Sequence, residues 1–235
     1  MTKSKKIIVA TSVLAVILLF ASAFLFWVEK EPQECEVIFY SDNERVISVS
    51  RILSGQTAIP PVDPQLRNGL VFQKWDKDVT NIKQDTEFHP QYVSVSESEN
   101  AFVIPGTYGE YGTTVSVPLK LCGKVCLSGV DLTVEYDSDV LQLKDVTNAD
   151  EAVIYNGETP GMIRLNYVST ENTTADVDLC NFSFNILKDI SETPIHIKVN
   201  SICANGEQDE FYVPTYTLVD ASVYAFSVEG GAENG

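Results

Sequence analysis

The residues that could support catalysis are few and lie far apart in the chain. Its two histidines, His89 and His196, have no nucleophile motif and no second metal ligand near them in sequence. Asp137, Asp139 and Asp145 could form the carboxylate pair of a glycosidase or a calcium loop. Their spacing is typical of a turn after a strand, and the glycine and terminal glutamate of an EF-hand loop are missing. The sequence therefore predicts no catalytic residue, no metal site and no cofactor.

The charge of the chain excludes one class of partner. The 235 residues include 16 Lys and Arg against 33 Asp and Glu, which gives a net charge of −17. A surface this acidic repels phosphate backbones, so nucleic-acid binding is excluded. Because 44% of the residues are hydrophobic, the chain can bury a substantial core.

An apolar run near the N-terminus predicts the compartment. Residues 7–28 are uncharged and mostly apolar, and three lysines within residues 1–6 precede them. As a helix, this run would be about 33 Å long, enough to cross a hydrocarbon core of about 30 Å. The lysines predict that residues 1–6 form a cytoplasmic tail and that the acidic remainder is exported. We expect a single-pass protein of the cell membrane with an extracellular ectodomain.

A cleaved signal peptide is the alternative interpretation of the same run. The small residues Ala21-Ser22-Ala23 fit a cleavage site. The apolar run continues beyond them to Val28, so that cleavage would leave an apolar new terminus. This continuation favours an uncleaved anchor at residues 7–28.

The five cysteines are an odd number in an exported chain, so at least one lacks a partner within it. Cys180 alternates in phase with apolar residues and is expected to be a buried small side chain. Cys203 is in phase with Ile195, Ile197 and Val199, which predicts the same. Cys122 and Cys126 flank a Gly-Lys turn and could pair across it. Structural roles are favoured because no second Cys pair completes a metal site.

Short strands separated by turn residues are predicted for residues 35–95. The side chains of Val37 and Phe39 are expected on one face of a strand, with their neighbours on the other face. A turn at residues 42–44 leads to a second strand. A unit of about 60 residues has a marginal core. The large rings of Trp75 and Tyr92 are expected to supply much of it.

The order of aromatic and turn residues in this segment resembles the Listeria–Bacteroides repeat of bacterial surface proteins. The matching positions are Val37-Ile38-Phe39, Gly55, Pro61, Pro64, Gly69, Phe72, Trp75-Asp76, Asp85-Thr86 and Tyr92. Lys74 stands where the family usually has glycine, and His89-Pro90-Gln91 precedes the final tyrosine. The resemblance implies a small β-grasp-like fold in a spacer module without catalytic residues.

A second all-β region follows a polar link at residues 94–100. Apolar and polar residues alternate along residues 115–121, 130–136 and 163–167, and further strand patterns continue to residue 228. Pro118 places its strand at a sheet edge or beside a bulge. The pattern predicts a two-sheet sandwich over residues 101–228. We expect residues 99–229 to fold without the preceding region, because the link is polar.

This second region resembles a cohesin module, the scaffold partner of dockerin domains in cellulosomes. The stretches that match are Val115-Ser-Val-Pro-Leu, Gly129-Val-Asp-Leu-Thr-Val-Glu-Tyr136-Asp137, Val140-Leu141, Gly161-Met-Ile-Arg-Leu-Asn-Tyr167, Leu179-Cys-Asn-Phe-Ser-Phe184 and Asp220-Ala-Ser-Val223. The resemblance covers nearly the whole region. It implies a nine-stranded jelly roll that binds a dockerin.

The resemblance also implies a binding face. In cohesins one sheet face meets the dockerin, and the matching outward position here is Asp131, followed by Thr133 and Glu135 on the same strand. Gly129 stands where some cohesins have asparagine, so one familiar contact is missing. Three residues are expected on neighbouring strands of that face, namely Tyr155, Arg164 and Asn166. For each of these residues the alternative is a solvated strand side chain without a partner.

Three functions remain open, and an enzyme ranks below them. The first is a membrane-anchored, cell-surface cohesin-type scaffold module that binds dockerin-bearing proteins in a cellulosome-like assembly for polysaccharide degradation. Calcium would be held by the dockerin, since dockerins resemble paired EF-hand loops. The second is a carbohydrate-binding module with polysaccharide as its partner, although Trp27 and Trp75 are assigned to the anchor and to the small domain. The third is a structural adhesin or stalk.

Overall fold

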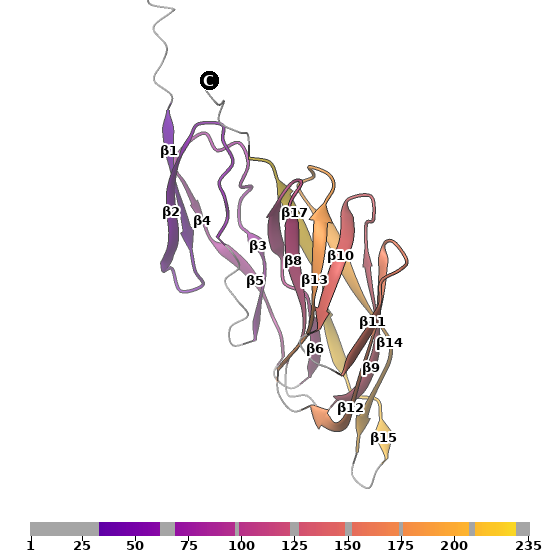
Figure 1. Ribbon diagram of the computed structural model, residues 1–235. Helices are drawn as coiled ribbons and strands as arrows, with labels where there is room; N and C mark the ends of the chain where they lie inside the picture. Colours follow the sequence, from indigo (N-terminus) through magenta and orange to yellow (C-terminus); the bar gives the residue numbers. More distant parts are fainter. Residues whose placement is uncertain are drawn as a thin grey trace, which may run out of the picture. The chain divides into compact units, whose positions relative to one another are not determined.

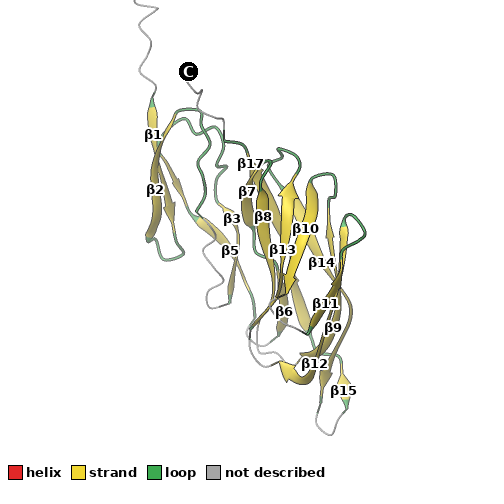
Figure 2. Ribbon diagram, in the orientation of Figure 1, coloured by secondary structure: helices red, strands yellow, loops and turns green. Residues whose placement is uncertain are grey.

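The computed structural model describes residues 33–61, 69–96, 99–122, 127–148, 152–173, 176–206 and 210–228. All regular secondary structure in these residues is β-strand, as Figure 2 shows, which confirms the all-β prediction for them. Within them, no helix is long and apolar enough to cross a membrane. The predicted anchor at residues 7–28 lies outside the described residues. Residues 35–235 form one compact unit, and the description below concerns this unit.

The first five strands form an N-terminal lobe with two small sheets. One sheet has the order β2-β1-β4, with β1 and β4 parallel, and the other pairs β3 with β5. Phe39 stacks on Phe88 at 4.6 Å between ring centroids, and Trp75 contacts Phe39 edge-on at 4.9 Å. Trp75 is buried and Tyr92 packs against this cluster, so both predicted rings contribute to the core. The strands are β1 (Glu34–Tyr40), β2 (Val46–Leu53), β3 (Leu70–Trp75), β4 (Thr86–Phe88) and β5 (Pro90–Ser94).

The remaining strands form a two-sheet sandwich, visible in Figure 1. A five-stranded sheet has the order β10-β13-β8-β6-β16, and a seven-stranded sheet has the order β11-β12-β9-β14-β17-β7, with β15 paired to β14. The strands are β6 (Asn100–Val103), β7 (Thr107–Glu110), β8 (Thr114–Cys122), β9 (Leu127–Tyr136), β10 (Leu141–Asn148), β11 (Val153–Asn156), β12 (Met162–Thr173), β13 (Val177–Ile186), β14 (Thr193–Asn205), β15 (Phe211–Tyr212), β16 (Tyr216–Val219) and β17 (Ala221–Phe226).

The sandwich core follows from the alternation seen in the sequence. Leu132 and Val134 on β9 point inward, and so do Phe182 and Phe184 on β13. These side chains are almost fully buried, and each contributes about 1.5–3 kcal/mol of transfer free energy. The residues between them on each strand point to the outer faces, where a partner can reach them.

The strand count differs from the nine that the resemblance implied. The chain leaves the five-stranded sheet after Val103 and joins the seven-stranded sheet at Thr107, so β6 and β7 are separate strands in different sheets. The short strand β15 adds a further partner at the end of β14. Pro118 lies on β8, an interior strand of the five-stranded sheet, so the sheet-edge alternative was wrong. A register shift between Asp178 and Cys180, opposite Lys120 and Leu119, agrees with the alternative of a nearby bulge.

The cysteines bear out part of the sequence analysis. Cys180 is fully buried as predicted, and burial raises the pKa of its thiol to about 12. Cys203 is a correction, because a bulge between Val199 and Ser201 shifts the alternation of β14 and turns Ile202 inward in its place. Cys203 is therefore only partly buried.

Of the two cysteines that could pair across the Gly-Lys turn, the structure describes Cys122. Cys122 is a free, buried thiol, which does not agree with a disulfide to Cys126. Burial, with a smaller effect of Asp176, raises the pKa of Cys122 to about 12. Cys126 itself lies outside the described residues.

Candidate functional site

The candidate binding surface is the outer side of β11, β12, β9 and β14, here called the β9 face. Directly opposite residues of antiparallel strands point to the same side of a sheet, so the register defines rows across this face. One row holds Arg164, Thr133 and Lys198, and in the next Asn166 lies opposite Asp131. The structure thus brings together the predicted residues Asp131, Thr133, Arg164 and Asn166.

Hydrogen bonds organise the centre of the β9 face. The Asn200 side-chain amide donates to Asp131 Oδ1 at 3.0 Å and to Thr133 Oγ1 at 2.9 Å. Asn200 is the residue that the bulge in β14 inserts opposite β9, so the bulge supplies this donor. Thr133 is only 5% exposed, whereas Asp131 stays partly accessible. A partner can therefore reach Asp131 more easily than Thr133.

Two exposed cations lie in the central row of the β9 face. Arg164 and Lys198 lie on either side of Thr133, and both side chains are exposed. Among the described residues, neither of them forms an ion pair. The predicted contact Glu135 lies one row further on, opposite His196, and is also exposed. The exposed side chains of Arg164 and Lys198 are therefore accessible to acidic groups of a partner, beside the carboxylates of Asp131 and Glu135.

The other end of the β9 face is apolar. Ile154 lies opposite Asn166 and is 72% exposed, and Val168 lies opposite Gly129 and is 69% exposed. Gly129 has no side chain that could cover the surface next to Val168. A Cβ atom at this position would lie 3.0 Å from Cys203 Sγ. These two aliphatic residues are not among the contacts expected from the sequence. Their alternation with the inward residues of β11 and β12 is the signal that could have indicated them.

Tyr155 is a correction to the predicted face. It pairs with Leu165, which is buried in the sandwich core, whereas its neighbours Ile154 and Asn156 pair with the outward residues of β12. Tyr155 therefore points to the opposite side of the sheet from Asp131, at the exposed edge strand. A shift of one residue in register exchanges the two faces of a strand, and the sequence alone did not define the register of β11.

The candidate catalytic residues are structural. Asp137 Oδ1 accepts a hydrogen bond from the Asp139 amide at 2.9 Å, as expected for a turn after a strand. Asp145 Oδ1 accepts one from the next amide in the chain at 2.9 Å. His89 stacks on Tyr40 with 4.8 Å between ring centroids. The described part of the chain contains no group of three or more His, Cys, Asp or Glu side chains arranged to hold a metal.

His196 has a partner that the sequence did not reveal. Its Nδ1 lies 3.0 Å from Asp220 Oδ2, and both side chains are largely exposed. The other oxygen of Asp220 accepts a hydrogen bond from the Ile197 amide at 2.8 Å. Asp220 thus links β14 to the start of β17, and the histidine contact is part of that link.

Comparison with known proteins agrees with this architecture. No curated protein matches the chain. The seventh ScaB type I cohesin from Pseudobacteroides cellulosolvens has a TM-score of 0.52 and 15% identity, covering 59% of this chain and 98% of that one. This likeness supports the cohesin type of sandwich.

Two other solved structures are similar to a comparable share of the chain. A type I cohesin–dockerin complex from Clostridium thermocellum has a TM-score of 0.46 and 19% identity, covering 55% of this chain and 100% of that one. The sixth cohesin of Acetivibrio cellulolyticus scaffoldin B, solved with the Cel5 dockerin, has a TM-score of 0.45 and 22% identity, covering 56% and 100%. The Cohesin domain profile matches residues 101–223, more than half of the chain, and the chain therefore belongs to the cohesin family.

Proposed function

We propose that this chain binds a dockerin through the β9 face. Cohesin domains are non-enzymatic dockerin-binding modules, which agrees with the expected lack of catalysis. The observation that supports this face is its composition. Exposed aliphatic side chains at Ile154 and Val168 lie beside the partly accessible Asp131, and Arg164 and Lys198 have no ion pair among the described residues. Such a mixture gains free energy when a complementary surface covers it.

The composition of the β9 face defines the chemistry of the dockerin surface that fits it. Aliphatic side chains of the partner would cover Ile154 and Val168. Carboxylates of the partner would meet Arg164 and Lys198, and a hydrogen-bond donor would meet Asp131. Calcium would belong to the dockerin, whose paired EF-hand-like loops need it to fold.

The setting of this interaction is also a proposal. An uncleaved helix at residues 7–28 would hold the module at the cell surface, so that bound dockerin proteins form a cellulosome-like assembly for polysaccharide degradation. Intact-mass analysis of the membrane-extracted protein tests the anchor. A mature N-terminus at Phe24 would contradict it, as would recovery mainly in the medium.

Calorimetric titration of the full chain against each dockerin of the host tests the binding itself. We expect calcium-dependent binding to at least one of them, with chelator abolishing it. The melting temperature of this chain should stay nearly unchanged in chelator, since calcium is assigned to the partner. Binding to none of the dockerins would refute the proposal. Binding to soluble polysaccharide in their place would favour the carbohydrate-binding alternative.

A further inference from the structure

The N-terminal lobe and the sandwich share hydrophobic clusters. Val71 of the lobe and Val95 of the link pack in one buried cluster with residues of the five-stranded sheet. The sandwich members of this cluster are Ala101, Val103, Cys122 and Val219. In a second cluster, Phe226 of β17 packs among the aromatic residues of the lobe core. The polar link at residues 94–100 thus joins two bodies that bury apolar surface against each other.

Backbone contacts fix the same junction. The Gly106 amide donates to the Phe72 carbonyl at 2.8 Å. A Cβ atom at Gly106 would lie 1.6 Å from the Gln73 carbonyl oxygen, so a side chain at this position would push the lobe away from the sandwich. Only glycine allows two backbones to approach this closely.

Tyr108 closes the junction from the sandwich side. Its hydroxyl oxygen accepts a hydrogen bond from the Trp75 amide at 3.0 Å, and its ring stacks on Tyr224 at 4.7 Å between centroids. Burial raises the pKa of Tyr108 well above its usual value. A hydrogen bond with this little access to water holds the lobe in one position more firmly than an exposed one.

We propose that the N-terminal lobe is an integral part of the cohesin module, and that the two unfold as one cooperative unit. The lobe packs on the outer side of β6 in the five-stranded sheet and, through Tyr108 and Phe226, on β7 and β17, at the other end of the seven-stranded sheet from β11 and β12. It therefore acts as a rigid mount that holds the β9 face in one orientation and leaves it open. This proposal replaces the sequence-based expectation that residues 99–229 fold by themselves, and it does not depend on the identity of the ligand.

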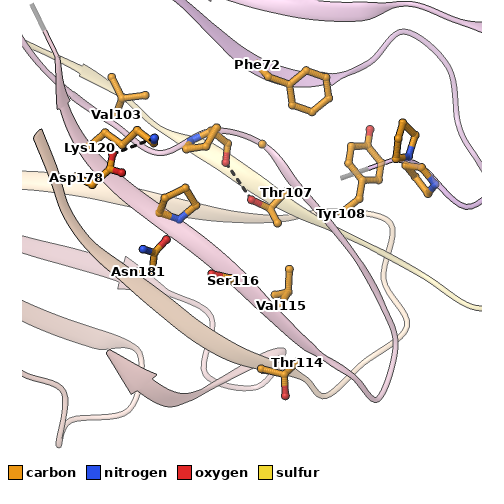
Figure 3. Close-up of a pocket in the computed structure, with 15 residues that line it drawn as sticks. Phe72, Val103, Thr107, Tyr108, Thr114, Val115, Ser116, Lys120, Asp178 and Asn181 are labelled. Carbon is orange, nitrogen blue, oxygen red and sulfur yellow. Dashed lines mark hydrogen bonds and ion pairs between the residues drawn. The ribbon is translucent and has the colours of Figure 1, made fainter. Parts of the chain in front are cut away.

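A groove of about 500 Å³ lies beside the contact between the lobe and the sandwich. Figure 3 shows Phe72 of the lobe on one side of it, and Ser116 and Asn181 of the five-stranded sheet on the other. Lys120 and Asp178 form an ion pair along its floor, at 2.9 Å. The junction residues Val103, Gly106 and Tyr108 line this groove, and single substitutions there can test the junction.

Two spectroscopic probes can separate the lobe from the sandwich in the full chain. The chain has two tryptophans, so Trp27→Phe leaves Trp75 as the only one, and its fluorescence reports the lobe. Far-UV circular dichroism reports mainly the strands of the sandwich. In the detergent-solubilised full chain, we expect both signals to change at the same midpoint on heating. Transitions separated by more than about 5 °C would overturn the proposal.

A substitution on the sandwich side of the junction sharpens this test. Val103→Ala removes two methyl groups from the shared cluster, and should lower both midpoints together by roughly 4–8 °C. Val213→Ala is the matched control, because this valine is 75% exposed and should leave both midpoints within about 1 °C. A shift of the circular dichroism midpoint without a shift of the Trp75 midpoint would show two independent domains.

A second, milder variant tests the hydrogen bond alone. Tyr108→Phe keeps the ring and removes the acceptor for the Trp75 amide. We expect it to lower the Trp75 midpoint by about 2–6 °C, with the circular dichroism midpoint following it. Tyr111→Phe, at a tyrosine that is 49% exposed, is the control. Equal midpoints for Tyr108→Phe and Tyr111→Phe would refute a locked junction.

Discussion

The two sheets of the sandwich have outer faces of opposite character. On the five-stranded sheet, here called the β8 face, polar side chains bind one another. Lys120 Nζ lies 2.9 Å from Asp178 Oδ1, and Thr114 Oγ1 donates to Asn185 Oδ1 at 2.8 Å. The apolar residues of β6, among them Val103, are covered by the N-terminal lobe. This face has its partners within the chain.

The β9 face has exposed apolar and charged side chains instead. Ile154 and Val168 remain more than two-thirds exposed, and Arg164 and Lys198 have no ion pair among the residues that the structure describes. Both faces show the same alternation in sequence. The difference shows that a candidate binding face is one whose side chains lack partners within the chain. Only such unsatisfied groups gain free energy from a new contact. Four measurements can break or sharpen this comparison.

The largest expected difference lies between two thiols, one on each face. Cys122 is buried beneath the lobe with a pKa of about 12, whereas Cys203 lies partly exposed beside Gly129. The thiolate is the reactive form, and a raised pKa lowers its fraction at pH 8. Cys203 should therefore react with iodoacetamide at least about a hundred-fold faster than Cys122.

Peptide mapping by mass spectrometry over a time course measures both rates in the native full chain. Trypsin cleavage after Lys124 separates Cys122 from Cys126. Cys180, which is buried with a pKa of about 12, is the internal control and should react as slowly as Cys122. Fast labelling of Cys122 would mean that the lobe does not cover the β8 face in solution.

The next largest effect concerns the apolar end of the β9 face. Ile154→Asp introduces a charge where we expect aliphatic contact, and should weaken dockerin binding by about 2–3 kcal/mol, or thirty- to more than a hundred-fold. Ile59→Asp, at an isoleucine of the lobe that is 62% exposed, is the matched control. Titration calorimetry measures both affinities. Equal affinities for the two variants would remove Ile154 from the interface.

Asp131 at the centre of the face should give a somewhat smaller effect. Asp131→Ala should cost roughly 1.5–3 kcal/mol of binding free energy, a ten- to hundred-fold loss of affinity, if its carboxylate accepts hydrogen bonds from the dockerin. Asp178→Ala on the β8 face is the control, because its carboxylate already pairs with Lys120. A loss below about 0.5 kcal/mol at Asp131 would identify it as a solvated strand residue.

The smallest effect is expected for the unpaired cations. Lys198→Gln should slow dockerin association a few-fold at low salt, and the difference should disappear as salt screens the charges. Lys120→Gln on the β8 face should leave the association rate unchanged, because that lysine is paired within the chain. Stopped-flow measurements at two ionic strengths distinguish the outcomes. A salt-independent loss at Lys198 would point to direct packing in place of steering.

The sequence by itself determined the strands and the inward side of most of them. The alternation of Val130, Leu132 and Val134 predicts which side of β9 is buried, because successive side chains of a strand point to opposite faces of the sheet. The same local rule correctly predicted that the side chains of Asp131 and Glu135 point outward and that Cys180 is buried. The cohesin resemblance at residues 101–228 rested on these stretches, and the match over residues 101–223 confirms it.

Tertiary structure decided what depends on a partner strand. The bulge at Asn200 reversed the facing of Cys203, and the register between β11 and β12 placed Ile154 on the β9 face in the position expected for Tyr155. The buried cluster of Val71 in the lobe, Val95 in the polar link and Val103 in the sandwich likewise spans the predicted domain boundary. Bulges, register and interdomain burial are set by residues distant in sequence, so a strand's own alternation cannot encode them.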